Sequence, residues 1–115
     1  MGRTILNEEK YNHLCAEAVS LAQSILADEG DFLSNVSKLS SLRFDLGNSE
    51  FDEDFLIFIE ISSETDHIPY GKARENCSAE WLEKCDKEIS ETKEYYRDKI
   101  EKSCKTIIRR FTKSA

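Results

Sequence analysis

Apolar residues recur at intervals of three and four positions along most of this 115-residue chain, and this spacing limits the fold more than any other feature. Such spacing places the apolar side chains on one face of an α-helix. The clearest run lies within residues 8–28, which we predict to be a helix. Asn7 is a favourable residue before a helix, and Gly30 suits the left-handed backbone that often follows one. The apolar positions of this run are Tyr11, Leu14, Cys15, Ala18, Leu21, Ala22, Ile25 and Leu26.

Two further helices are predicted on different grounds. Helical spacing continues from a cap at Asp31 or Ser34 as far as Gly47. Residues 55–61 are ambiguous, because their β-branched and aromatic residues favour a strand whereas the acidic residues 52–54 resemble the first turn of a helix. The chain offers no second strand, and an isolated strand would leave its backbone polar groups unpaired. A helix is therefore predicted there.

A connector and one long helix complete the predicted architecture. The connector covers residues 63–74, which hold the only proline of the chain. The last helix is predicted to begin near Ser78 and to continue to Phe111, a length of about 50 Å if it is unbroken. A break near Thr92 is the alternative. These elements predict an all-α fold in a single domain, residues 1–115, built as a small bundle of about four helices with a long C-terminal helix.

Composition and cysteine spacing indicate a protein of the cytoplasm. The chain is 39% hydrophobic, which is enough for a core, while its longest apolar run, residues 55–59, is too short for a membrane span. No apolar signal core follows the N-terminus. The cysteines lack paired short spacings, so we expect free thiols in a reducing compartment. They are Cys15, Cys77, Cys85 and Cys104.

Negative charge is concentrated in one stretch of the sequence. Between Arg43 and Lys72 the chain carries eight carboxylates and no lysine or arginine, although the net charge of the whole chain is only −7. A patch of one sign attracts oppositely charged surfaces and repels polyanions. We therefore predict a surface that binds a basic protein, and we expect no direct binding of nucleic acid and no membrane contact. The predicted binding residues are Asp45, Glu50, Asp52, Glu53, Asp54, Glu60, Glu64 and Asp66.

No constellation in the sequence predicts catalysis or a cofactor. Four scattered glycines form no phosphate-binding loop, and neither histidine lies in a recognisable nucleophile motif. The nearest approach to a metal site is a group of three carboxylates and one histidine, whose ligands suit a divalent cation if a helix aligns them. The simpler interpretation is that residues 63–66 form a network of hydrogen bonds at a helix end or turn, and that this network pairs with Arg43 or Arg74. The candidate metal ligands are Glu60, Glu64, Asp66 and His67.

Three segments carry a resemblance to a known family. They read Leu-Ser-Ser-Leu-Arg-Phe-Asp-Leu-Gly at residues 39–47, Asp-Glu-Asp-Phe-Leu-Ile-Phe at residues 52–58, and Ser-Glu-Thr-Asp-His-Ile-Pro at residues 63–69. With these segments the chain resembles a family of small bacterial proteins defined only as a domain of unknown function. The third segment is the most specific, and the similarity covers about residues 25–111. Cys77 stands where the family usually has tryptophan or an equivalent residue, so the packing before the last helix is left open.

The resemblance implies a cytosolic, mostly helical protein that is not an enzyme. By analogy with other small proteins of this kind, it implies an immunity protein that neutralises a polymorphic or contact-dependent bacterial toxin. We expect the acidic stretch to cover the basic active-site surface of a cognate toxin, in particular a nuclease. A regulatory or scaffold domain that binds another protein through the same patch is the alternative, and a metal-dependent hydrolase is a third. Either a monomer or a homodimer is compatible with the sequence.

Overall fold

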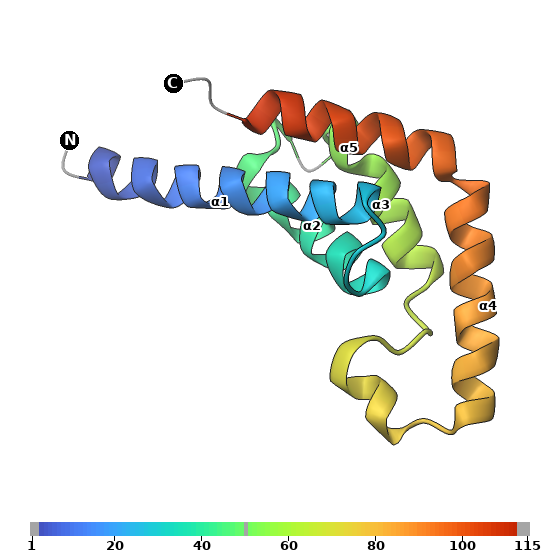
Figure 1. The fold of residues 1–115 in the computed structure, drawn as a ribbon. Helices are drawn as coiled ribbons and strands as arrows, with labels where there is room; N and C mark the ends of the chain where they lie inside the picture. The colour runs from blue at the N-terminus through green and yellow to red at the C-terminus, as the bar shows by residue number, and fades with distance from the viewer. Residues whose placement is uncertain (1–2, 50, 113–115) are drawn as a thin grey trace.

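Every regular element that the structure describes is helical, so the prediction of an all-α fold is confirmed (Figure 1). The structure is a computed structural model, and it describes residues 3–49 and 51–112. No helix within these residues is long and apolar enough to cross a membrane. The elements are α1 (Arg3–Leu26), α2 (Phe32–Leu46), α3 (Glu53–Glu64), the 3₁₀ helix η1 (Gly71–Asn76), α4 (Ala79–Tyr95) and α5 (Arg97–Phe111).

Four of these helices form a bundle, and α4 stands away from it (Figure 1). Helices α1 and α5 lie alongside each other, α2 packs against α1 and α3, and α3 also packs against α5. Helix α4 leaves the bundle at a steep angle and, together with η1, forms an arm. The molecule measures 55 × 29 × 24 Å and has a radius of gyration of 15.5 Å. A compact chain of this length would have a radius of gyration of about 13 Å, so the arm makes the molecule elongated.

The core lies among the four bundled helices, and it explains why residues 55–61 are helical. Phe55, Phe58 and Ile61 are fully buried and recur at helical spacing on the face of α3 that meets the other helices. The rings of Phe55 and Phe111 lie 6.1 Å apart, which joins α3 to the end of α5. A helix satisfies its own backbone hydrogen bonds, so α3 is buried here without a partner strand. The predicted helix over this stretch is confirmed.

The predicted single long C-terminal helix is wrong, because it is broken into α4 and α5 at Tyr96. The backbone of Tyr96 departs from helical values, with φ −101° and ψ 10°, and its side chain is buried. Its hydroxyl donates to both carboxylate oxygens of Glu64 on α3, at 2.8 Å. No glycine or proline lies at the break, and this tertiary contact holds the corner, which lies four residues beyond Thr92, near which the alternative break was predicted. Together with η1, the break raises the number of helices above the predicted four.

The predicted helix starts at Asp31 and near Ser78 agree with the structure, where both residues are N-caps. Asp31 accepts a hydrogen bond from the N–H of Ser34 at 3.0 Å, and Ser78 accepts one from the N–H of Trp81 at 3.1 Å. The exception is α1, which begins at Arg3 and therefore contains Asn7. An N-cap contributes only about 1 kcal/mol, and no helix-breaking residue precedes Asn7 after Arg3, so the helix continues through it.

Candidate functional site

The acidic stretch does not form one continuous patch, because two of its carboxylates turn inward. The Asp52 side chain is only 5% exposed and accepts hydrogen bonds from the N–H groups of Asn48 at 2.8 Å and Asp54 at 3.0 Å. It therefore caps α3. Nη1 of Arg110, on α5, donates to Asp52 at 3.0 Å and to Asp54 at 2.8 Å. Burial alone would raise the pKa of Asp52, but the two N–H donors and Arg110 outweigh burial and lower it.

Two more of the predicted residues are drawn to the corner between α4 and α5. Glu64 accepts the Tyr96 hydroxyl, and Glu60, one turn earlier on α3, also faces that hydroxyl. Hydrogen bonding to Glu64 and then to Glu60, together with burial, raises the pKa of Tyr96. Asp66 is exposed in the turn after α3, beside the arm. Glu50 lies outside the described residues.

Three of the predicted carboxylates, Glu60 among them, border exposed apolar side chains. Asp45 at the end of α2 and Glu53 and Glu60 on α3 are exposed and are in no ion pair with another described residue. Near them, Phe44 is 64% exposed and Phe51 is 70% exposed. We call this surface the α2–α3 face. It consists of Arg43, Phe44, Asp45, Phe51, Glu53, Leu56, Ile59 and Glu60.

Two shallow hollows shape this surface, one on the α2–α3 face and one along its border with α5. The first, of about 340 Å³, is lined by Arg43, Phe51, Leu56, Ile59 and Glu60. The second, of about 380 Å³, lies between α3 and α5 and is lined by Glu53, Leu56, Ile57, Glu60, Lys99, Lys102 and Ser103. Leu56 and Glu60 line both hollows, so they form the ridge between them. The guanidinium of Arg43 lies 4.1 Å from the ring centroid of Phe44, which continues the apolar surface beyond the first hollow.

Sequence reasoning identified the carboxylates of this face but missed its aromatic residues. Phe44 lies one position after Arg43 and off the buried stripe of α2, and Phe51 lies in the loop before α3. An aromatic residue outside an otherwise regular apolar stripe is the signal that could have revealed them. Exposed apolar patches bordered by polar residues are typical of protein-binding surfaces.

The alternative metal site is not assembled by the fold. Glu64 is bound to Tyr96, whereas Nε2 of His67 lies 2.8 Å from the carboxylate of Glu88 on α4. The part of the chain that the structure describes contains no group of three histidine, cysteine, aspartate or glutamate residues placed to hold a metal ion. Three of the four candidate ligands are therefore drawn to two different contacts, Glu60 and Glu64 to Tyr96 and His67 to Glu88.

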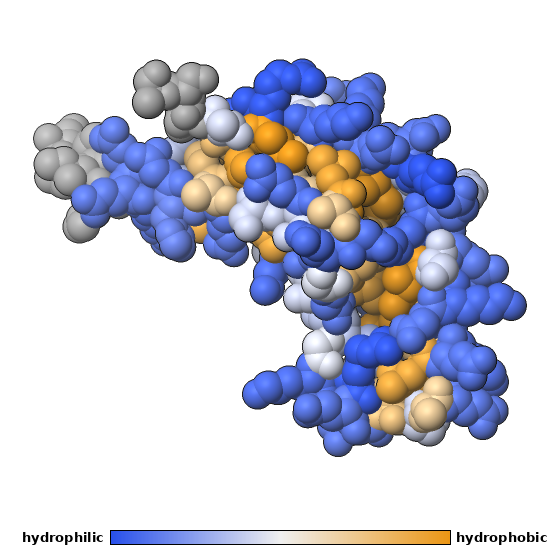
Figure 2. All heavy atoms as spheres, in the orientation of Figure 1, coloured by the Kyte–Doolittle hydropathy of each residue, from blue (hydrophilic) through white to orange (hydrophobic). Residues whose placement is uncertain are grey.

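A further hollow lies in the angle between the bundle and α4. It has a volume of about 430 Å³, and Figure 2 shows apolar side chains gathered where α4 meets the bundle. Two ion pairs, Lys93 with Asp28 and Arg97 with Glu94, join charged groups that line it. Because these charges are already neutralised within the chain, this hollow would distinguish between partners by their charge less than the α2–α3 face would. Its apolar lining is Ile25, Leu26, Phe32 and Ile100.

Comparison of the chain with protein-family models, with curated proteins and with solved structures yields no match. The family resemblance of residues 39–47, 52–58 and 63–69 therefore stays a prediction. In the fold these segments are the second half of α2, the first half of α3 with its cap, and the end of α3 with the turn after it. The first two segments contribute five of the eight residues of the α2–α3 face, namely Arg43, Phe44, Asp45, Glu53 and Leu56.

Proposed function

We propose that this protein is a cytoplasmic immunity protein that binds a cognate bacterial toxin through the α2–α3 face and covers the toxin's basic active-site surface. The observation that carries the proposal is the exposure of Phe44 and Phe51 beside three carboxylates, Asp45, Glu53 and Glu60, that have no ion-pair partner among the described residues. The protein acts by binding and performs no chemistry of its own.

The apolar residues supply the affinity of such a complex. Full burial of a phenylalanine or leucine side chain contributes about 1.5–3 kcal/mol, and aromatic residues near the centre of an interface often dominate binding. Phe44, Phe51 and the 40% exposed Leu56 lie close to one another in the sequence on two packed helices and their connecting loop. A rigid bundle holds them in place before the partner arrives, which reduces the ordering cost of binding.

The carboxylates supply the choice of partner and the speed of association. A nuclease must present positive charge to hold phosphate groups, so an acidic face competes for the same surface. Charges at the rim of an interface act mainly on the association rate, and salt screens them. We therefore expect association that slows as the salt concentration rises and dissociation that depends on Phe44, Phe51 and Leu56.

Co-expression with the protein encoded immediately upstream tests this proposal. The tagged chain is purified from cells that express both proteins, and growth of those cells is measured. A stable complex with equal amounts of both proteins, together with rescue of growth, is the expected result. A toxic neighbour that is neither bound nor neutralised would contradict the proposal.

Variants of the face locate the contact. Phe51→Ala and Leu56→Ala should each weaken the complex at least tenfold, a loss of about 1.4 kcal/mol or more. Tyr95→Ala is the matched control, because Tyr95 is 80% exposed but lies at the corner of α4 and α5, outside the α2–α3 face. Equal weakening by all three variants would argue against this face. A stable complex with a harmless partner would favour the regulatory or scaffold alternative.

A further inference from the structure

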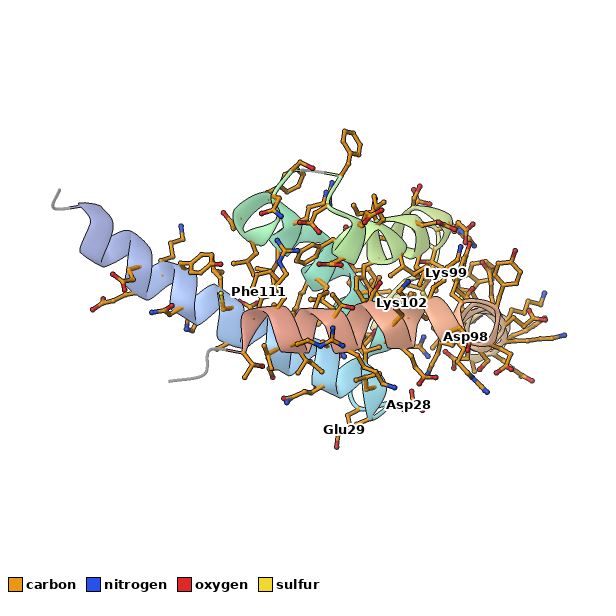
Figure 3. The ribbon with its side chains drawn as sticks, turned by 90° about the horizontal axis from the view of Figure 1, so that it is seen from above. Asp28, Glu29, Asp98, Lys99, Lys102 and Phe111 are labelled. Carbon is orange, nitrogen blue, oxygen red and sulfur yellow. The ribbon has the colours of Figure 1, made fainter. Side chains whose placement is uncertain are left out.

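The second hollow, along the border of the α2–α3 face with α5, carries charges of both signs. Glu53 and Glu60 line it from α3, whereas Lys99 and Lys102 line it from α5. Figure 3 shows both lysines on the side of α5 that faces α3. None of these four groups is in an ion pair with another residue of the described ranges. Two rows of opposite charge therefore lie on the two sides of one hollow without neutralising each other.

This arrangement fits a second copy of the same chain. In an interface with two-fold symmetry, each patch meets an identical patch after half a rotation, so the patch must complement itself. The two-fold axis of such a dimer runs along the hollow, between α3 and α5. Half a rotation about this axis places α5 of each copy opposite α3 of the other copy. The lysines of each copy then meet Glu53 and Glu60 of the other copy. We propose that the free protein forms a homodimer through this hollow.

Apolar contact reinforces the pairing of charges. Leu56 lies one turn from both Glu53 and Glu60, so it is enclosed when the charged rows of two copies meet. The methylene groups of Lys99 and Lys102 provide further apolar cover. The net charge of −7 on each copy opposes association at long range. Salt at physiological concentration screens charges separated by more than about 8 Å, so the close pairs in the hollow outweigh this repulsion.

The homodimer and a complex with another protein compete for the same surface, because Leu56 and Glu60 line both hollows. The homodimer would then be a stored form of the protein, in which Leu56 stays covered until the toxin displaces the second copy. This role rests on the proposed function. The homodimer itself does not depend on it. Self-association can accordingly be tested without any partner.

Sedimentation of the 115-residue chain over a wide concentration range tests the homodimer. Wild-type protein should move from its monomer mass of 13.3 kDa towards twice that mass as concentration rises. Lys99→Glu/Lys102→Glu leaves only carboxylates across the hollow, and Glu53→Lys/Glu60→Lys leaves only lysines. Each double variant alone should remain a monomer. An equimolar mixture of the two should form a heterodimer, since each lysine row again meets a row of carboxylates.

A heterodimer in the mixture would show that both double variants are folded and that each alone has lost only the contact between copies. If either double variant loses its helical circular dichroism, Lys102→Glu and Glu53→Lys test the same contact without altering Glu60 and its neighbour Tyr96. Lys105→Glu is the control outside the hollow and should leave self-association unchanged. A wild-type protein that is monomeric at every concentration, or double variants that each dimerise with themselves, would overturn the homodimer. A monomer that still neutralises the toxin would overturn the homodimer alone and leave the proposed function intact.

Discussion

The guanidinium of Arg110, in the last turn of α5, lies 3.0 Å from the carboxylate of Asp52, which caps α3. The same guanidinium lies 3.4 Å from the carbonyl oxygen of Leu46, at the end of α2. Arg110 therefore ties the last helix to both ends of the loop that carries Phe51. The position of the exposed aromatic residues depends on a side chain almost sixty positions further along the chain.

We expect Arg110→Ala to lower the free energy of unfolding by about 2–3 kcal/mol, because it leaves Asp52 buried without its cationic partner. The loss falls below that of a fully uncompensated buried charge, since two backbone N–H groups still bind Asp52. Urea denaturation measures the change. Arg109→Ala, which removes an exposed arginine next to it, should cost less than about 0.5 kcal/mol. Equal effects of the two substitutions would show that the contact with Asp52 contributes little.

The lowered pKa of Asp52 predicts a dependence of stability on acid. Because the pKa is lower in the folded than in the unfolded protein, the ionised carboxylate stabilises the fold above the unfolded pKa. This contribution is lost as the pH falls from the ordinary pKa towards the lowered one. Denaturation measured from neutral to acidic pH should show the loss in wild-type protein, and Asp52→Asn should be less stable at neutral pH with a shallower acid slope. An unchanged slope in Asp52→Asn would assign the acid sensitivity to other groups.

Tyr96→Phe removes the hydroxyl that joins the corner of α4 and α5 to Glu64. We expect a loss of about 1 kcal/mol, because the exposed carboxylate of Glu64 regains hydrogen bonds from water. The raised pKa of Tyr96 also predicts that the wild-type fold is favoured below the ordinary tyrosine pKa and loses this contribution at more alkaline pH. An ultraviolet titration of tyrosinate should show a late-ionising tyrosine that Tyr96→Phe lacks. Identical titration curves would contradict the contact with Glu64.

Backbone amides of α4 should exchange with solvent faster than those of α5. Helix α4 contributes one buried residue, Cys85, whereas α5 contributes four. The ion pairs that attach α4 to the turn after α3 and to η1, His67 with Glu88 and Arg74 with Asp86, are at least partly exposed and contribute little. Local opening of the arm therefore requires less free energy than opening of the bundle. Hydrogen exchange read by mass spectrometry measures the difference, and equal protection of the two helices would show that the arm is an integral part of the core.

The positions of most helices could be predicted from the sequence because they depend on neighbouring residues. The apolar stripe of α1, the caps Asp31 and Ser78, and the acidic first turn of α3 all act within one or two turns of the chain. The three carboxylates of the candidate site, Asp45, Glu53 and Glu60, could also be predicted, because they belong to the acidic stretch of the sequence. These features follow from helical periodicity and capping alone.

The tertiary structure decided which charges and which aromatic residues remain on the surface. Arg110 neutralises Asp52 and Asp54 from a distant helix, and Glu64 places the break in the last helix by binding Tyr96. Such pairs cannot be predicted from neighbouring residues in the sequence, because the interacting groups come together only when the helices pack. Amino-acid order alone therefore determined an all-helical chain with an acidic segment. Packing determined that this segment presents a face of exposed aromatic residues bordered by carboxylates that have no ion-pair partner among residues 3–49 and 51–112.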